Sequence, residues 1–223
     1  MSLPCRVRVL GLMFLAGLLG LAEQAWPAGG HGRQLIRAVT ENDLSTVREL
    51  LRQGVEVDFH DLRGRTALLH AVDGNHVEIA RLLIDAGADV NAQDKIEDSP
   101  LLLAGASGRL EILKLILKAN PDFNIFNRYG GTPLIPACER GHVEVVKLLL
   151  TTGVDIDHVN HLGWTALMEA IVLSDGGPRH QAIVRMLVDA GADVSIPDHD
   201  GVTPLEHARE KGFDRIAALL QGN

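Results

Sequence analysis

The chain has 223 residues, of which 46% are hydrophobic and 4% aromatic, so it can bury a sizeable core as one elongated domain. Its formal net charge of −8 disfavours nucleic acid or an anionic membrane surface as a partner, because the sequence contains no cluster of basic residues that would attract them despite this charge. Of the two cysteines, only Cys138 lies beyond the N-terminal segment described next, which excludes an internal disulfide in the mature chain.

Residues 1–28 have the layout of a secretory signal peptide. Arg6 and Arg8 precede a short uncharged apolar stretch, residues 9–22, and small residues suited to cleavage lie from Ala22 to Ala28. The apolar stretch is shorter than the roughly 20 residues of a membrane span, so a retained anchor is the weaker alternative. We therefore expect a periplasmic or secreted mature protein with no stable insertion in the membrane.

A block of about 33 residues repeats through the rest of the chain. Asp89, Asp122 and Asp155 occupy the same position in successive blocks, and Asp193 follows after a longer interval. This period is typical of a solenoid, in which each unit buries its apolar face only by stacking on its neighbours. The predicted units are 33–62, 63–95, 96–128, 129–161, 162–199 and 200–223, with a degenerate first unit and a last unit that ends early.

Each unit predicts two helices joined by a short turn. A hydroxyl residue suited to cap the first helix recurs at Thr66, Ser99, Thr132, Thr165 and Thr203. Residues that tolerate left-handed backbone end this helix at Asn42, Asn75, Gly108, Gly141 and Gly212. The second helix carries Leu pairs toward the core and ends at Gly54, Gly87, Asn120, Gly153 and Gly191.

These residues resemble the ankyrin repeat, with its T-P-L-H cap, G-H-x-E-I-V helix start and G-A-D-V-N turn, and in particular secreted or periplasmic bacterial ankyrin-repeat proteins. The resemblance implies an all-α solenoid of about six helix-turn-helix units with short turn or β-hairpin fingers. The family has His after Leu in the cap motif, whereas this chain has Leu69, Leu102, Ile135, Met168 and Glu206. We expect the hydrogen bonds of that His across repeats to be missing and apolar packing to replace them.

The fifth unit contains extra residues around Ser174 to Pro178, which account for the longer interval before Asp193. Their composition predicts a longer loop after the first helix. A tolerated surface insertion and a specificity loop on the binding side are both open interpretations.

The sequence contains no catalytic signature, so we predict neither an enzyme nor a cofactor. His158 and His161 have H-x-x-H spacing in an expected turn, but a solvated turn is preferred to a metal site because no cysteine accompanies them. The resemblance places His76, His142 and His180 at the start of second helices. Cys138 is expected to be a buried inert thiol, with a redox role as the alternative.

The ankyrin resemblance implies a concave binding groove lined by the turn tips and the exposed side of the first helices. The candidate binding residues in these slots are Arg63, Arg65, Lys95, Ile96, Arg128, Tyr129, Arg140, His161 and Trp164. Tyr, Trp and Arg often dominate binding energy, although Tyr129 and Trp164 could instead cover turn backbone. The arginines form a basic strip that suits a partner with an acidic surface.

The sequence thus predicts a monomeric, non-catalytic scaffold or adaptor that binds an unidentified protein outside the cytoplasm. Two alternatives remain open. One is a small-molecule or metal-binding envelope protein, and the other is an intracellular ankyrin adaptor held by a membrane anchor. Fold alone does not choose among them.

Overall fold

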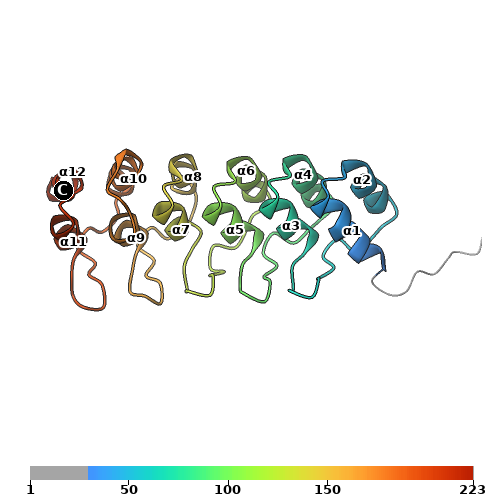
Figure 1. Ribbon diagram of the computed structural model, residues 1–223, viewed down its shortest axis with the longest axis horizontal. Helices are drawn as coiled ribbons and strands as arrows, with labels where there is room; N and C mark the ends of the chain where they lie inside the picture. The colour runs from blue at the N-terminus through green and yellow to red at the C-terminus, as the bar shows by residue number, and fades with distance from the viewer. Residues whose placement is uncertain (1–29, 223) are drawn as a thin grey trace, which may run out of the picture.

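The computed structural model describes residues 30–222, which form twelve α-helices arranged as six pairs in a single row (Figure 1). The predicted signal peptide lies outside the described residues. The pairs are α1 (Gly30–Thr40) and α2 (Leu44–Arg52), α3 (Ala67–Asp73) and α4 (Val77–Asp85), α5 (Pro100–Ala106) and α6 (Leu110–Lys118), α7 (Leu134–Glu139) and α8 (Val143–Leu149), α9 (Ala166–Val172) and α10 (Pro178–Asp189), and α11 (Pro204–Glu210) and α12 (Asp214–Gln221).

The first helices of the pairs form one layer and the second helices form the other (Figure 1). The loop that precedes each first helix after α1 extends away from both layers, and we call it the finger of that helix. The α3, α5, α7, α9 and α11 fingers comprise residues 56–66, 89–99, 122–132, 155–165 and 193–203. Each finger is a turn closed by a backbone hydrogen bond, such as the 3.0 Å bond from the N–H of Asp61 to the carbonyl of Arg65. Residues 30–222 contain no strand, so the fold is all-α and the fingers are turns, not β-hairpins.

One continuous apolar core runs along the row. Small residues of the first helices lie at the contacts between repeats with 0% exposure, at Ala71, Ala104, Ala137, Ala170 and Ala208. The second helices bury Leu83, Ile116, Leu149 and Leu187 to the same extent. These two series follow the sequence period, because each repeat buries its apolar face only against the next one. No helix of residues 30–222 has the length and hydropathy that a membrane span needs.

Four of the five predicted caps are present. The hydroxyl oxygens of Thr66, Ser99, Thr165 and Thr203 each accept a hydrogen bond from the backbone N–H three residues later. Thr132 is the exception, because its buried hydroxyl has no hydrogen-bond partner and α7 begins only at Leu134. Pro136 explains the late start, since it has no N–H to donate to the carbonyl of Thr132.

The left-handed residues predicted at the ends of the first helices are confirmed, with φ between 55° and 71° at Asn42, Asn75, Gly108, Gly141 and Gly212. Among the residues predicted to end the second helices, Gly54, Gly87, Asn120 and Gly191 have φ between 52° and 92°, whereas Gly153 does not have a positive φ. The chain after α8 is turned instead by the N–H groups of Thr151 and Thr152, which donate to the carbonyls of Leu148 and Leu149. The last repeat continues beyond Gly212, where the sequence pattern stopped, and forms a second helix, α12.

The extra residues of the fifth repeat are divided between a loop and a helix. α9 ends at Val172, and α10 begins at Pro178 and has 12 residues, against 9 in α4 and α6. The insertion therefore lengthens the loop and also adds a turn to the second helix. As a result His180, which was expected to start α10, is its third residue, whereas His76 and His142 do precede the first residues of α4 and α8.

Apolar packing at the cap motif is confirmed for Leu69, Leu102, Ile135 and Met168, which are at most 3% exposed. Glu206 instead accepts hydrogen bonds from Thr203 in a capping box. Histidine hydrogen bonds across repeats are nevertheless present, because other histidines supply them. The Nε2 of His142 donates to the carbonyl of Ala106 in the preceding repeat at 3.2 Å.

Candidate binding groove

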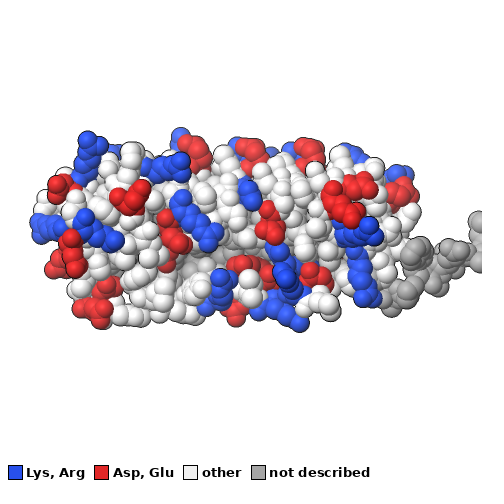
Figure 2. All heavy atoms as spheres, viewed as in Figure 1, with Lys and Arg blue, Asp and Glu red and all other residues white. Residues whose placement is uncertain are grey.

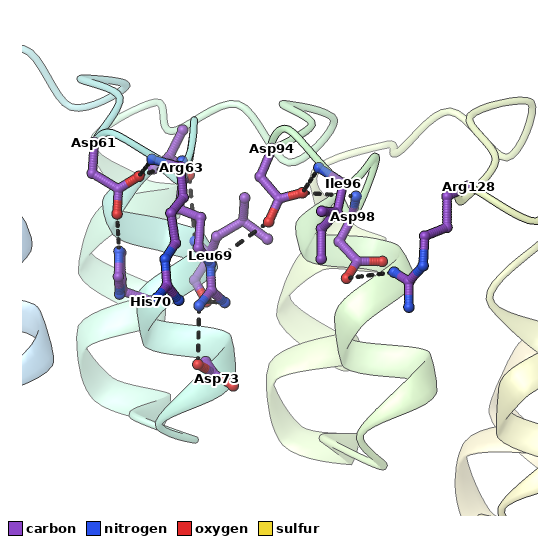
Figure 3. Close-up of polar contacts among 11 residues, drawn as sticks. Asp61, Arg63, Leu69, His70, Asp73, Asp94, Ile96, Asp98 and Arg128 are labelled. Carbon is purple, nitrogen blue, oxygen red and sulfur yellow. Dashed lines mark hydrogen bonds and ion pairs between the residues drawn. The ribbon is translucent and has the colours of Figure 1, made fainter.

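A polar pair joins three of the fingers to their own first helices. His70 lies 3.0 Å from Asp61 (Figure 3), and His207 lies 2.7 Å from Asp198. In the α9 finger, the side-chain amide of Asn160 donates to Glu169 at 2.8 Å. The hydrogen bond from His207 holds the pKa of Asp198 below its ordinary value. These pairs hold the fingers against the helix layer.

The α5 and α7 fingers have no such pair. Leu103 and Pro136 occupy the helix positions that His70, Glu169 and His207 occupy elsewhere, and neither can bond to Asp94 or Asn127. A groove of about 460 Å³ lies at this place, and both Leu103 and Pro136 line it. The groove therefore lies where two consecutive repeats lack the polar pair.

The groove is lined by α5, α7, α9 and their fingers. Its apolar lining comes mainly from Leu103, Ala106, Pro136, Leu162 and Leu173. Its charged lining comes from Asp98, Arg128, Glu139, Arg140 and Glu169. This combination of an apolar wall and a few convergent polar groups is typical of a site that receives a side chain or a small ligand.

Glu169 is the buried polar group of the groove, with 5% exposure. Burial raises its pKa to about 7, and the nearby negative charge of Glu139 acts in the same direction. The hydrogen bond from Asn160 and the positive charge of Arg140 oppose the rise. The sequence did not single out Glu169 or Asn160, because neither belongs to a recognisable motif.

Cys138 is fully buried next to this groove, as predicted. Burial raises the pKa of its thiol well above the ordinary value, and the charge of Glu169 adds to the effect. The thiol is therefore protonated at neutral pH, and only a thiolate is a strong nucleophile. This environment fits the interpretation of an inert thiol.

Three apolar side chains at the tips of successive fingers form an exposed row, which we call the fingertip row; two of them, Tyr129 and Leu162, also line the groove. Ile96, Tyr129 and Leu162 are 53%, 50% and 47% exposed, and each occupies the same position of its repeat. A cation or histidine precedes each of them, at Lys95, Arg128 and His161. The N–H of His161 donates to the carbonyl of Tyr129 at 2.8 Å, so the last two fingers of the row are fixed to each other.

Arg128 links the fingertip row to the groove. Its guanidinium lies over the ring of Tyr129, 4.7 Å from the centroid, and 3.8 Å from the carboxylate of Asp98 (Figure 3). Removal from water and the charge of Asp94 raise the pKa of Asp98, while Arg128 opposes this rise. The positive charge of Arg128 is thus partly balanced within the protein.

The candidate binding residues do not all lie together. Arg128, Tyr129 and Arg140 line the groove, while Arg63, Lys95, Ile96 and His161 are exposed on the fingertips. Arg65 contradicts the expectation of an exposed slot, since its side chain is only 15% exposed and pairs with Asp73 at 3.1 Å and Asp94 at 3.8 Å. Trp164 is half-buried and does not line the groove.

The basic strip is therefore less continuous than expected. Figure 2 shows basic and acidic side chains side by side over the fingers below α3 and α5, whereas the surface below α7 and α9 is mainly uncharged. Acidic neighbours balance Arg65 and Arg128, but Arg63 and Lys95 have no ion pair among residues 30–222.

The two histidines of the H-x-x-H sequence have separate surroundings. His158 stacks on Phe126 with ring centroids 4.4 Å apart, and its Nε2 donates to the carbonyl of Gly130 at 2.6 Å. His161 is exposed at its fingertip. Within residues 30–222, no three His, Cys, Asp or Glu side chains are grouped so that they could hold a metal ion.

Comparison with known proteins agrees with this architecture. The family described as ankyrin repeats (3 copies) matches residues 35–127 and 122–198. The crystal structure of an ankyrin repeat domain from Acinetobacter baumannii AYE is 49% identical, with a TM-score of 0.83, over 85% of this chain and 96% of that chain. The crystal structure of the ankyrin repeat protein EF0377 is 46% identical, also with a TM-score of 0.83, over 88% of this chain and 98% of that one.

A shorter match links the chain to the putative ankyrin repeat protein YahD of Escherichia coli (strain K12). The two are 57% identical over 53 residues, which span 24% of this chain and 26% of YahD. The family match and both solved structures together cover most of the described helices. The chain therefore belongs to the ankyrin repeat family, whose repeat domains generally bind other proteins and are typically non-catalytic.

Proposed function

We propose that this protein is a monomeric, non-catalytic scaffold or adaptor that binds a partner protein through the fingertip row and the adjoining groove. The observation that carries the proposal is the exposure of Ile96, Tyr129 and Leu162 at one position of three successive fingers. Contiguous exposed apolar side chains mark interaction sites. Arg128 also lies over the ring of Tyr129, and Tyr and Arg are residue types that often contribute much of the binding energy of an interface.

The charges beside the row bear on the partner. Arg63 and Lys95 are exposed and unpaired among residues 30–222, so they favour an acidic stretch of the partner near the α3 and α5 fingers. Arg65 is not available for this contact, because Asp73 and Asp94 occupy its guanidinium. The proposed partner is thus acidic opposite Arg63 and Lys95 and apolar opposite Ile96, Tyr129 and Leu162.

The proposed compartment is the periplasm or the extracellular space. The basic residues, the short apolar stretch and the small residues within positions 1–28 support it. N-terminal sequencing of the protein purified from its host tests this part, since a first residue near Glu23 or Trp26 indicates cleavage. A chain that keeps Met1 and sediments with membranes would favour the anchored adaptor instead.

Affinity capture from host extract tests the binding role. We expect the full chain to retain a partner, and the combined variant Ile96→Ala, Tyr129→Ala and Leu162→Ala to lose it. Val159→Ala is the matched control, because Val159 is 44% exposed on the α9 finger but lies outside the row. Equal recovery of the partner by the triple variant would overturn the assignment of the surface.

A further inference from the structure

The groove contains two carboxylates, Glu139 and Glu169, that form no ion pair among residues 30–222. The side chain of Glu139 makes no hydrogen bond or ion pair with any of residues 30–222. Glu169 accepts its hydrogen bond from Asn160, which is neutral, and has no ion pair within the same part of the chain. Asp98 differs, because Arg128 lies 3.8 Å away. A buried negative charge without a partner is unfavourable, so this pair is suited to gain a cation.

Two cations line the groove, and both make contacts with other groups of its wall; the charge of Arg140 acts on Glu169 without forming an ion pair with it. Arg140 lines the groove, but its Nη1 donates to the carbonyl of Ala106 at 2.8 Å. Arg128 lies between Asp98 and the ring of Tyr129. An anionic ligand would therefore compete with these contacts and would also meet Glu139 and Glu169. The charge of the groove thus favours a cation over a carboxylate or phosphate.

The walls of the groove indicate what carries the cation. Leu103, Ala106 and Pro136 offer an apolar surface, and Leu173 is exposed at its edge. Basic amino-acid side chains have an apolar stem and a charged head, and they pack the stem on apolar surface. A metal ion or a bare ammonium would leave these walls unused.

We propose that the groove receives the arginine or lysine side chain of a partner segment, with its stem against Leu103 and Pro136 and its cationic head between Glu139 and Glu169. This inference rests on the proposed function and adds a specificity determinant to it. The partner segment is then acidic opposite Arg63 and Lys95 and places one basic side chain in the groove.

Binding of a cation is coupled to the ionisation of Glu169. The pKa of about 7 means that the carboxyl is protonated in most molecules at pH 6 and ionised in most at pH 8. A cation binds the ionised form more tightly, so affinity rises with pH across this interval. The expected gain between pH 6 and pH 8 is about tenfold.

The test uses the full chain and blocked tripeptides, with binding followed by NMR. The probe is acetyl-Gly-Arg-Gly-amide, and the controls replace arginine with norleucine or glutamate. We expect the arginine peptide to shift the amide signals of Ala106 and Leu173, which line the groove, and to bind more tightly at pH 8 than at pH 6. Equal or stronger binding by either control peptide, or no shift of these signals, overturns the proposal.

Two variants locate the cation. Glu139→Gln and Glu169→Gln are each expected to weaken the arginine peptide about tenfold at pH 8, which corresponds to about 1.4 kcal/mol, and the second is expected to remove the pH dependence. Glu144→Gln, on the exposed surface of α8, is the matched control. Unchanged affinity in both groove variants overturns the proposal, and Glu139→Gln keeps it testable if Glu169→Gln fails to fold.

The capture experiment separates this inference from the proposed function. A partner that is lost from the triple fingertip variant but retained by Glu139→Gln and Glu169→Gln confirms the binding surface and overturns the basic anchor. A partner retained by the triple variant contradicts the proposed surface whatever the tripeptides do.

Discussion

The imidazole of His180 donates a hydrogen bond from Nε2 to the backbone carbonyl of Glu139, one repeat earlier, at 3.0 Å. Asp73 and Ala106 occupy the position of Glu139 in the two preceding repeats, and their carbonyls accept from Arg109 at 3.0 Å and His142 at 3.2 Å. The insertion in the fifth repeat thus changes the sequence spacing but preserves the contact, because the added turn of α10 places His180 where a donor is needed.

This contact should contribute measurably to stability. Replacing His180 with Ala leaves the carbonyl of Glu139 without this donor, and we expect the free energy of unfolding to fall by about 1 to 2 kcal/mol. Urea denaturation measures the change. His60→Ala is the control, since His60 is exposed, and a similar loss in both variants would contradict the role given to His180.

Glu97 adopts a left-handed conformation, with φ of 63°, at a finger position where the other fingers have glycine. A residue with a Cβ is conformationally strained there. We expect Glu97→Gly to raise the free energy of unfolding by about 1 kcal/mol, as measured by the urea midpoint.

The reverse change at the equivalent position of the next finger is the control. Gly130 has φ of 70°, and a Cβ there would lie 2.6 Å from the ring of His161. Gly130→Ala should therefore destabilise the protein. If Glu97→Gly lowers the midpoint as well, backbone strain at Glu97 is not the explanation.

Thr132 and Thr165 occupy equivalent positions but should respond oppositely to substitution. The hydroxyl of Thr165 accepts the N–H of Met168 at 3.2 Å, whereas that of Thr132 is buried without a hydrogen-bond partner. Thr165→Val should cost about 1 kcal/mol through loss of the cap. Thr132→Val should be neutral or stabilising, because it removes an unsatisfied buried group. Equal losses in the thermal midpoint would show that the hydroxyl of Thr132 does find a partner.

Glu169 should make stability depend on pH. Its pKa is raised from 4.5 to about 7 in the folded protein, so folding favours the protonated carboxyl. This contribution is complete below about pH 4.5 and is lost as the pH rises through 7. The advantage of Glu169→Gln over the unmodified protein should therefore grow as the pH rises between these two values and remain above pH 7. We expect it to reach at most about 3 kcal/mol in the free energy of unfolding.

Urea denaturation at pH 5 and pH 7.5 checks this expectation, with Glu144→Gln as the exposed control. Glutamine keeps an oxygen that can accept the hydrogen bond of Asn160, so the comparison isolates the charge. A difference between Glu169→Gln and the unmodified protein that is the same at both pH values would show that Glu169 titrates normally.

Much of the fold could be predicted from the sequence because it depends on local and periodic features. The caps at Thr66 and Thr165 act on backbone three residues away, and the buried Ala71 and Ala104 recur with the period. The error at Thr132 has the same local origin, since Pro136 has no N–H to donate to the carbonyl of Thr132 and so α7 starts later.

The candidate site could be predicted only in part. The sequence singled out Tyr129, Ile96 and Arg128 because residue type and register suffice to place them on the fingertips. It misjudged Arg65, since pairing with Asp73 and Asp94 depends on how one finger lies against the next. Register alone does not reveal which charges are already neutralised.

The sequence by itself therefore determined the repeat, the helix pairs and the exposed fingertips, because each of these follows from contacts within a repeat or from identical contacts between repeats. Only the tertiary structure decided where the groove lies and what it holds. Leu103 and Pro136 leave two fingers without a polar pair, and the stacking of α7 on α9 brings Glu139 near Glu169. The charge of the groove thus arises from residues that belong to different repeats and interact only because the repeats stack.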